Sequence, residues 1–250
     1  MLAVILCAGT GSRTGLNYPK CVHKFHDGTT LIEKNIINLK KSGFKNSQII
    51  FATGYEEKMI KKITLNNYKY IKNSKYRTTN MMYTLNEVIK RVKSQDVYIL
   101  YADIVYDYLI LKKLIASKKN ITTLIDTDWL QKWKIKKDYT DDFETLKIKK
   151  NKIINLGEKT NNLKNIDGRY IGITKFSKKF INNLKKKKLI KKELLINQKI
   201  DFTSFLMKLI NQRYGVFCLK NKIKWFEFDS KYDFQIFEKY KTKFVAKLNL

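Results

Sequence analysis

Residues 1–20 read MLAVILCAGTGSRTGLNYPK, and this stretch decides the fold. The apolar run at 2–6 predicts a short buried strand, and Gly9 and Gly11 follow it directly. Glycine has no Cβ, so such a loop can bring backbone N–H groups close to a ligand. The sequence therefore predicts a strand that ends in a loop suited to binding phosphate.

Two cations follow the glycines. Arg13 lies inside the loop, and Lys20 comes directly after Pro19, the only proline of the chain. Their simplest use is to neutralise a polyphosphate, although a tight turn with solvated charges is the plain alternative. The spacing is neither that of a Walker A loop nor that of a Rossmann dinucleotide fingerprint.

Strand and helix patterns alternate through the first half of the chain. Helices are expected at 30–43, 55–63, 79–92 and 107–118, and strands at 47–54, 68–71, 96–103 and 121–125. Alternation of this kind predicts a parallel sheet covered by helices on both faces.

The second half has a mixed pattern. Strands are expected at 144–148, 152–158, 169–176, 216–221 and 223–229, with helices over FSKKFINNLKKK, over DFTSFLMKLINQRYG and at 232–244. We predict an α/β, Rossmann-like three-layer fold with a mostly parallel mixed central sheet and a small β subregion. No linker divides the chain, so 1–250 is expected to form one domain.

The net charge of +30 raises the question of nucleic-acid binding. Only five of the 52 basic residues are arginines, however, and the lysines are spread over the whole chain. Nucleic-acid recognition favours arginine forks, so a solvated surface is the preferred interpretation and a basic nucleic-acid-binding protein is the alternative. The three cysteines lack metal-site spacing and are expected to be reduced, buried fillers.

The apolar run at 2–6 is too short for a signal peptide, and no apolar stretch is long enough to cross a bilayer. We therefore expect a cytoplasmic protein without membrane insertion.

The loop also carries a family resemblance. LCAGTGSRTGLNYPK resembles the L-x-A-G-x-G-x-R…P-K signature of nucleotidyltransferases that use nucleoside triphosphates; the matching residues are Leu6, Ala8, Gly9, Gly11, Arg13, Pro19 and Lys20. The resemblance implies a nucleotidyltransferase fold in which residues 1–125 bind the nucleotide. It implies that Arg13 holds the β- and γ-phosphates and that Lys20 stabilises charge at the α-phosphate. It also implies nucleotide contacts at Leu6, Ala8, Gly9, Thr10, Gly11, Ser12 and Ala102.

Two aspartates follow predicted strands. Asp103 ends ILYAD and Asp229 ends WFEFD, so both could share a divalent metal at one edge of the sheet, or each could cap a helix. LYADIVYD and WFEFDSKYDFQIFE resemble the metal-binding segments of bacterial choline-phosphate cytidylyltransferases, which implies that Asp103 and Asp229 hold Mg²⁺. Asp233 is expected to cap the last helix or to lie exposed.

Thr79 and Asn80 stand directly before a predicted helix. They suit capping, and they could equally read the edge of a pyrimidine base. In the choline-phosphate group a similar stretch faces the nucleotide, so the resemblance implies that both contact it.

Residues 126–148 combine two tryptophans with six acidic residues. Trp129 and Trp133 could form a cage for a cationic amine with nearby carboxylates, or could pack together on one helix face. With Tyr170, this region resembles cytidylyltransferases that act on phosphonates or on phosphorylated amino compounds such as phosphoglutamine. The resemblance implies acceptor contacts at Trp129, Trp133, Asp142, Glu144 and Tyr170.

Two further positions bear on this resemblance. Arg169 stands where that group usually has a polar amide. The basic residue expected after the second tryptophan is either Lys134 or Lys136.

The expected reaction joins CMP from CTP to a small phosphorylated or phosphonate amine and releases pyrophosphate, for surface-polysaccharide modification. Residues 126–250 would bind the acceptor and complete the metal site. A sugar-1-phosphate nucleotidyltransferase that uses UTP or dTTP is the alternative among enzymes. No nucleic-acid partner is expected, and a homodimer remains open.

Overall fold

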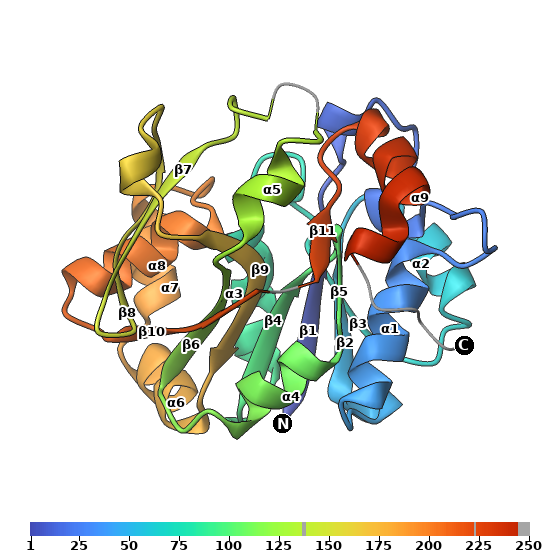
Figure 1. Cartoon of the computed structure of the whole chain (residues 1–250). Helices are drawn as coiled ribbons and strands as arrows, with labels where there is room; N and C mark the ends of the chain where they lie inside the picture. The colour runs from blue at the N-terminus through green and yellow to red at the C-terminus, as the bar shows by residue number, and fades with distance from the viewer. Residues whose placement is uncertain (137–138, 223, 245–250) are drawn as a thin grey trace.

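A nine-stranded mixed sheet forms the centre of the computed structural model, which describes residues 1–136, 139–222 and 224–244. Its strands lie in the order β3-β2-β1-β4-β9-β6-β10-β8-β7 (Figure 1). Strands β9 and β8 run against the others, because each pairs antiparallel with its neighbours. Both halves of the chain contribute strands, so the sheet is continuous from one to the other.

The first half supplies four parallel neighbours: β1 (Leu2–Cys7), β2 (Ile49–Thr53), β3 (Lys69–Lys72) and β4 (Val97–Tyr101). Every residue of β1 is buried, as expected for a strand covered on both faces. Leu2, Val4 and Leu6 face one hydrophobic cluster, whereas Ala3 and Ile5 face another. The alternation along β1 therefore separates the two helical layers of the fold.

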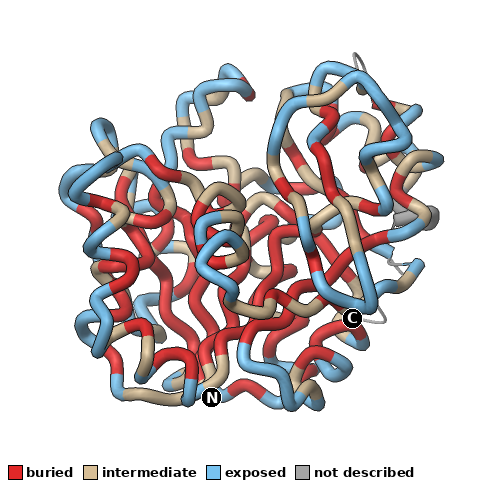
Figure 2. Tube along the Cα trace, turned by 90° about the vertical axis from the view of Figure 1, so that its left-hand side faces the viewer, coloured by how far each residue is buried: buried red, intermediate tan, exposed pale blue. Residues whose placement is uncertain are grey.

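Helices cover both faces of the sheet (Figure 1). The first layer contains α3 (Met81–Arg91), α6 (Lys178–Lys186), α7 (Leu189–Ile196) and α8 (Phe202–Asn211). The second contains α1 (Leu31–Lys41), α2 (Glu57–Ile63), α4 (Leu109–Ala116) and α5 (Trp129–Trp133). Figure 2 shows the buried strands as a continuous core between largely exposed loops. The predicted three-layer α/β fold is confirmed.

The second half extends the sheet with β6 (Ile121–Asp126), β9 (Arg169–Phe176), β10 (Val216–Asn221), β8 (Lys152–Lys159) and β7 (Glu144–Lys149). The predicted pair at 144–158 is a hairpin at the edge of the sheet. The last element that the structure describes is α9 (Lys231–Phe244), which packs a third cluster of aromatic residues against the segment after Lys20.

Two expected strands are shorter in the structure, and one short strand was not expected. The expected strand at 96–103 ends at Tyr101, and a separate strand β5 (Ile104–Tyr106) follows the turn at Asp103. β5 pairs with β11 (Trp225–Glu227) to form a small second sheet, so the expected strand at 223–229 is shorter and lies outside the main sheet. Ile223, where that prediction begins, lies outside the described residues. At this turn the chain leaves the main sheet. The turn could not be predicted because the residues on both sides of it are mostly apolar.

Helix α7 was not among the expected helices, and it directly follows the lysine run at 185–188. α6 does end there, but Lys188 adopts a left-handed conformation and α7 begins at the next residue. Other boundaries differ by at most two residues, except that α8 ends at Asn211, four residues before the end of the expected helix DFTSFLMKLINQRYG.

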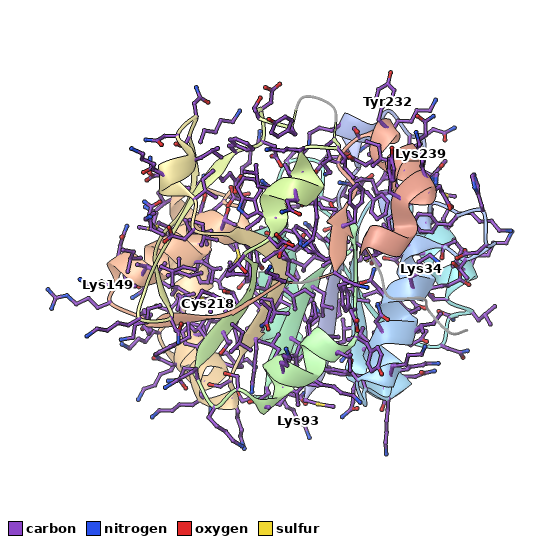
Figure 3. The ribbon with its side chains drawn as sticks, viewed as in Figure 1. Lys34, Lys93, Lys149, Cys218, Tyr232 and Lys239 are labelled. Carbon is purple, nitrogen blue, oxygen red and sulfur yellow. The ribbon has the colours of Figure 1, made fainter. Side chains whose placement is uncertain are left out.

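The basic charge is distributed around the molecule. Lys93, Lys149 and Lys239 project outward from different parts of the chain, and Cys218 lies inside (Figure 3). All three cysteines are buried and free, as predicted. In the part of the chain that the structure describes, no helix combines the length and apolar character needed to cross a membrane.

Candidate active site

The glycine loop leaves β1 at Cys7 and turns sharply at Gly11. Gly11 has a φ of 66°, and a Cβ there would lie 2.9 Å from Cγ of Lys20. Glycine is therefore required both for the backbone conformation and for the approach of the lysine. Gly9, by contrast, has no heavy atom within 4 Å of an added Cβ, so it faces open space above the sheet.

Lys20 connects three distant segments. Its Nζ donates to Oδ2 of Asp103 at 2.6 Å and to the carbonyl oxygen of Phe228 at 2.9 Å. The side chain is only 14% exposed. Burial alone would lower the pKa of Lys20, but the charges of Asp103 and Asp229 outweigh it and raise the pKa. Lys20 is therefore a fixed cation between the loop and the two aspartates.

The backbone holds Asp103 and Asp229 at the same edge of the sheet. The Phe228 N–H donates to the carbonyl oxygen of Asp103 at 2.9 Å and continues the pairing of β5 with β11. Asp103 lies two residues beyond β4, and Asp229 lies two residues beyond β11. Two carboxylates at neighbouring chain turns form a hard oxygen donor set that suits a divalent cation such as Mg²⁺.

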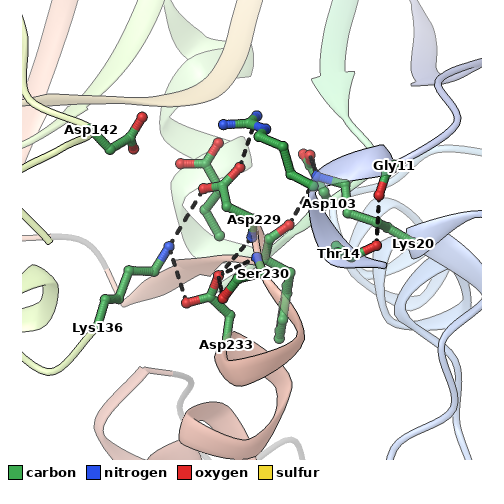
Figure 4. A network of polar contacts seen from close by, with 12 residues as sticks. Gly11, Thr14, Lys20, Asp103, Lys136, Asp142, Asp229, Ser230 and Asp233 are labelled. Carbon is green, nitrogen blue, oxygen red and sulfur yellow. Dashed lines mark hydrogen bonds and ion pairs between the residues drawn. The ribbon is translucent and has the colours of Figure 1, made fainter. Parts of the chain in front are cut away.

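Three cations surround Asp229. Oδ1 lies 3.1 Å from Arg13 Nη2, and Oδ2 lies 3.6 Å from Lys136 Nζ (Figure 4). Burial alone would raise the pKa of Asp229, but Lys136, Lys20 and Arg13 together lower it. The carboxylate is therefore held in its charged form.

Asp233 fixes the turn that presents Asp229. Its Oδ2 accepts hydrogen bonds from the N–H groups of Asp229 at 2.8 Å and Ser230 at 2.7 Å (Figure 4). Of the two roles expected for Asp233, capping is the one that the structure contains, and its side chain is buried. Lys136 also lies 3.5 Å from Asp233 Oδ1 and 4.2 Å from the ring centroid of Trp133. Lys136, rather than Lys134, is thus the lysine that reaches the site.

Several predicted nucleotide-binding residues line one small hollow of about 70 Å³, namely Leu6, Ala8, Gly9, Thr79 and Asn80. Ala102 lines a second hollow of about 80 Å³ with Gly11, Lys20 and Asp103. Asn80 caps α3 by accepting from the Met81 N–H, and its amide donates to the Lys199 carbonyl at 3.2 Å. Thr10 and Ser12 lie exposed on the loop. The structure therefore brings the two predicted halves of a nucleotide site together.

A larger pocket of about 340 Å³ lies beside these hollows. Four of the predicted acceptor residues line it: Trp129, Asp142, Glu144 and Tyr170. Trp133 is only 1% exposed and stacks on Trp225 with ring centroids 5.4 Å apart. Trp129 packs edge-on against Phe143. The two tryptophans therefore support the pocket mainly as packed side chains, and Trp129 is the one that lines it.

Sequence reasoning missed Glu227 and Asp201, which also line the pocket. Glu227 ends β11 two residues before Asp229, so alternation along the strand expected at 223–229 could have indicated it. Burial, followed by the charge of Asp229, raises the pKa of Glu227 to about 8 despite the nearby Arg169. Asp201 caps α8 by accepting from the Ser204 N–H at 2.7 Å, and its place in the pocket follows only from the tertiary packing.

Comparisons with known proteins place the chain in a family. A family model described as a MobA-like NTP transferase domain matches residues 3–133. The CTP:phosphoglutamine cytidylyltransferase of Campylobacter jejuni is 32% identical over 253 residues, covering 94% of this chain and 98% of that protein.

Solved structures share the fold at low identity. An inositol-1-phosphate CTP transferase from T. maritima has a TM-score of 0.72 at 18% identity, covering 92% of this chain and 90% of its own. A putative glucose-1-phosphate thymidylyltransferase from Bacillus anthracis has a TM-score of 0.71 at 15% identity, covering 96% and 94%. Enzymes named for different nucleotides thus share this architecture, so the fold alone does not identify the base.

Proposed function

The chain belongs to the MobA-like NTP transferase family and is a nucleotidyltransferase, and from that premise we propose that it transfers CMP from CTP to a small phosphorylated or phosphonate amine. Acceptors of the phosphoglutamine, choline phosphate or aminoethylphosphonate type are the candidates. The proposal places the enzyme in the cytoplasm, in surface-polysaccharide modification. Residues 1–125 would bind the nucleotide, and residues 126–250 would bind the acceptor and complete the metal site.

The observation that carries the proposal is the position of Lys20. Its buried ammonium lies 2.6 Å from Asp103 and 2.9 Å from the carbonyl oxygen before Asp229, at the base of a glycine loop. A fixed cation beside two charged carboxylates suits a phosphate group that gains negative charge during a reaction. The likeness to a cytidylyltransferase along most of the chain supports CTP as the donor.

In the proposed reaction, a phosphate or phosphonate oxygen of the acceptor attacks the α-phosphorus of CTP in line. The new P–O bond forms as the bond from the α-phosphorus to the bridging oxygen breaks, and pyrophosphate leaves with that electron pair. Glycine-loop amides and Arg13 hold the β- and γ-phosphates, while Lys20 stabilises charge on the α-phosphate oxygens.

Asp103 and Asp229 would hold Mg²⁺, because two carboxylates at the same edge of the sheet offer the oxygen ligands that this ion prefers. When bound, the ion neutralises phosphate charge. Arg13 would exchange its contact with Asp229 for the triphosphate, since its side chain is 71% exposed and can turn.

The acceptor would occupy the acidic pocket of about 340 Å³. Trp129 and Tyr170 supply aromatic walls, and Asp142 and Glu144 supply negative charge for an amine. An acidic pocket in a chain of net charge +30 is a local concentration of opposite sign, which favours a cationic group on the acceptor.

A panel of nucleotides tests this function. CTP, UTP, dTTP and ATP are incubated with Mg²⁺ and each acceptor type, and pyrophosphate release is measured. CTP-dependent release with an amine-bearing acceptor is expected. Release only with UTP or dTTP and a sugar 1-phosphate would replace the proposal by the sugar-nucleotide alternative.

A salt series tests the alternative of nucleic-acid binding. Because that binding would depend on counterion release, it predicts tight association with DNA or RNA that weakens steeply with salt. We expect instead that CTP with Mg²⁺ raises the melting temperature and that nucleic acid does not.

A further inference from the structure

Arg169 is held in a fixed orientation in the wall of the acceptor pocket. It begins β9, lines the pocket, and has a side chain only 13% exposed. Its Cζ lies 4.0 Å from the ring centroid of Trp133, which covers one face of the guanidinium. Nη1 donates to the Asp142 carbonyl oxygen at 2.7 Å, and Nη2 pairs with the Asp142 carboxylate and lies 3.5 Å from Glu227 Oε2. The guanidinium is therefore preorganised.

The guanidinium retains hydrogen-bonding capacity. It carries five N–H donors and stays charged at any relevant pH. Among the described residues its hydrogen bonds run from Nη1 and Nη2 to Asp142, and Nε donates to no acceptor. Arg169 stacks on Trp133 and still lines the pocket, with 13% of its side chain exposed.

Arg169 also changes the charge pattern that a ligand meets. Asp142 and Glu227 are paired with it, whereas Glu144 and Asp201 line the same pocket without an ion pair to it among the described residues. The pocket therefore offers the Arg169 guanidinium and, separately, two carboxylates that do not pair with it; Arg13, the other arginine of the lining, pairs with Asp229. An acceptor that carried only a cation would match one part of this pattern and would be repelled by the other.

On the basis of the proposed function, we propose that Arg169 binds a carboxylate of the acceptor, while Glu144 and Asp201 bind its ammonium group. The acceptor would then be a phosphorylated or phosphonate amino acid rather than a phosphorylated simple amine. A charge-assisted contact to a planar guanidinium suits a carboxylate, because the two groups match in geometry. Arg169 is thus a specificity-determining residue.

Two pairs of acceptors that differ only in a carboxylate test this inference. Phosphoserine is compared with phosphoethanolamine, and 2-amino-3-phosphonopropionate with 2-aminoethylphosphonate, by CTP-dependent pyrophosphate release. We expect kcat/KM to be about 10- to 100-fold higher for the carboxylate-bearing member of each pair, as for one lost charged contact. In Arg169→Gln the ratio should fall to about one, mainly through loss of activity on the carboxylate-bearing acceptor.

Control variants separate recognition from folding. Arg169→Gln leaves the Asp142 carboxylate without its partner, which could disturb the fold. The double variant Arg169→Gln/Asp142→Asn removes both charges and should also lose the preference for the carboxylate-bearing acceptor. Lys147→Gln removes a lysine that pairs with Asp167 at 38% exposure, outside the pocket lining, and should keep the wild-type ratio.

The outcomes distinguish the two levels of the proposal. Turnover with CTP but without preference for the carboxylate, or an unchanged ratio in Arg169→Gln, would leave Arg169 as a counter-ion only and overturn this inference. Absence of CTP-dependent release with these four acceptors and also with phosphoglutamine and choline phosphate would overturn the proposed function together with it.

Discussion

Replacing Lys20 by alanine should abolish most of the activity with a modest effect on stability. The substitution removes a cation 2.6 Å from Asp103, whose side chain is 22% exposed and can be rehydrated. We therefore expect a loss of about 1–2 kcal/mol in the free energy of unfolding, less than the cost of stranding a fully buried charge. For a chain of this size the melting temperature should fall by roughly 2–8 °C.

The catalytic effect should be larger. Loss of one preorganised group that stabilises transition-state charge costs about 10²–10³ in kcat, or about 2.7–4 kcal/mol. The assay is pyrophosphate release at saturating CTP, Mg²⁺ and acceptor, with kcat and KM determined separately. The loss should appear mainly in kcat, because Lys20 is expected to act on charge that develops during the reaction.

Lys34→Ala is the matched control. Lys34 forms an ion pair of the same length, 2.6 Å, with Asp27 and is 6% exposed, but it lies on α1. This variant should lose a similar amount of stability and retain its kcat. A folded Lys20→Ala enzyme within about threefold of wild-type kcat would refute the role of Lys20, as would an equal loss of kcat in Lys34→Ala.

Three further predictions concern the metal, the loop and pH. Asp229→Asn should lower kcat by at least about 10²-fold and raise the Mg²⁺ concentration needed for half-maximal rate; an unchanged metal titration would exclude Asp229 as a ligand. Gly11→Ala should destabilise the loop by about 1–2 kcal/mol and lower kcat, because φ is 66° and the new Cβ would meet Lys20 at 2.9 Å; wild-type activity and melting temperature would contradict this. Burial would raise the pKa of Asp27, but hydrogen bonds from Lys34 and Thr29 lower it to about 2. The contribution of Asp27 to the stability of the fold is therefore present above about pH 4 and is lost as pH falls toward 2. Urea unfolding should show Asp27→Asn less stable than wild type by about 1 kcal/mol at pH 5, after allowance for exposure, and nearly equal to it near pH 2; a difference independent of pH would refute the pairing.

The central sheet was predictable because its signals are local. In β1 a run of apolar residues ends at the glycine loop, and strand and helix patterns alternate along the following hundred residues. Strand β5 was not predicted from the sequence, and the strand expected at 223–229 was too long and was not assigned to a second sheet, because β5 and β11 each have three residues and lie in apolar surroundings. Short strands are defined by their partners rather than by their own pattern.

The site was predictable where one motif carries it. Lys20 and Asp103 were expected to serve one chemistry, and the structure brings them into contact. The position of Lys136 could not be predicted from the sequence, because its partners Asp229 and Asp233 are distant in sequence and only the tertiary structure brings them near α5. The four-residue spacing of Trp129 and Trp133 predicted that they share one face of a helix. It could not show that Trp225 would cover Trp133.

The most direct test of the account follows the α-phosphorus of CTP. CTP labelled at the α-phosphate is incubated with Mg²⁺, the enzyme and an amine-bearing phosphorylated acceptor, and the products are separated. The account predicts that the label appears in a CMP-acceptor conjugate, in equal amount to unlabelled pyrophosphate, and that Lys20→Ala loses both together. Label that stays in CTP with every such acceptor, while UTP or dTTP yields a sugar nucleotide, would contradict the account.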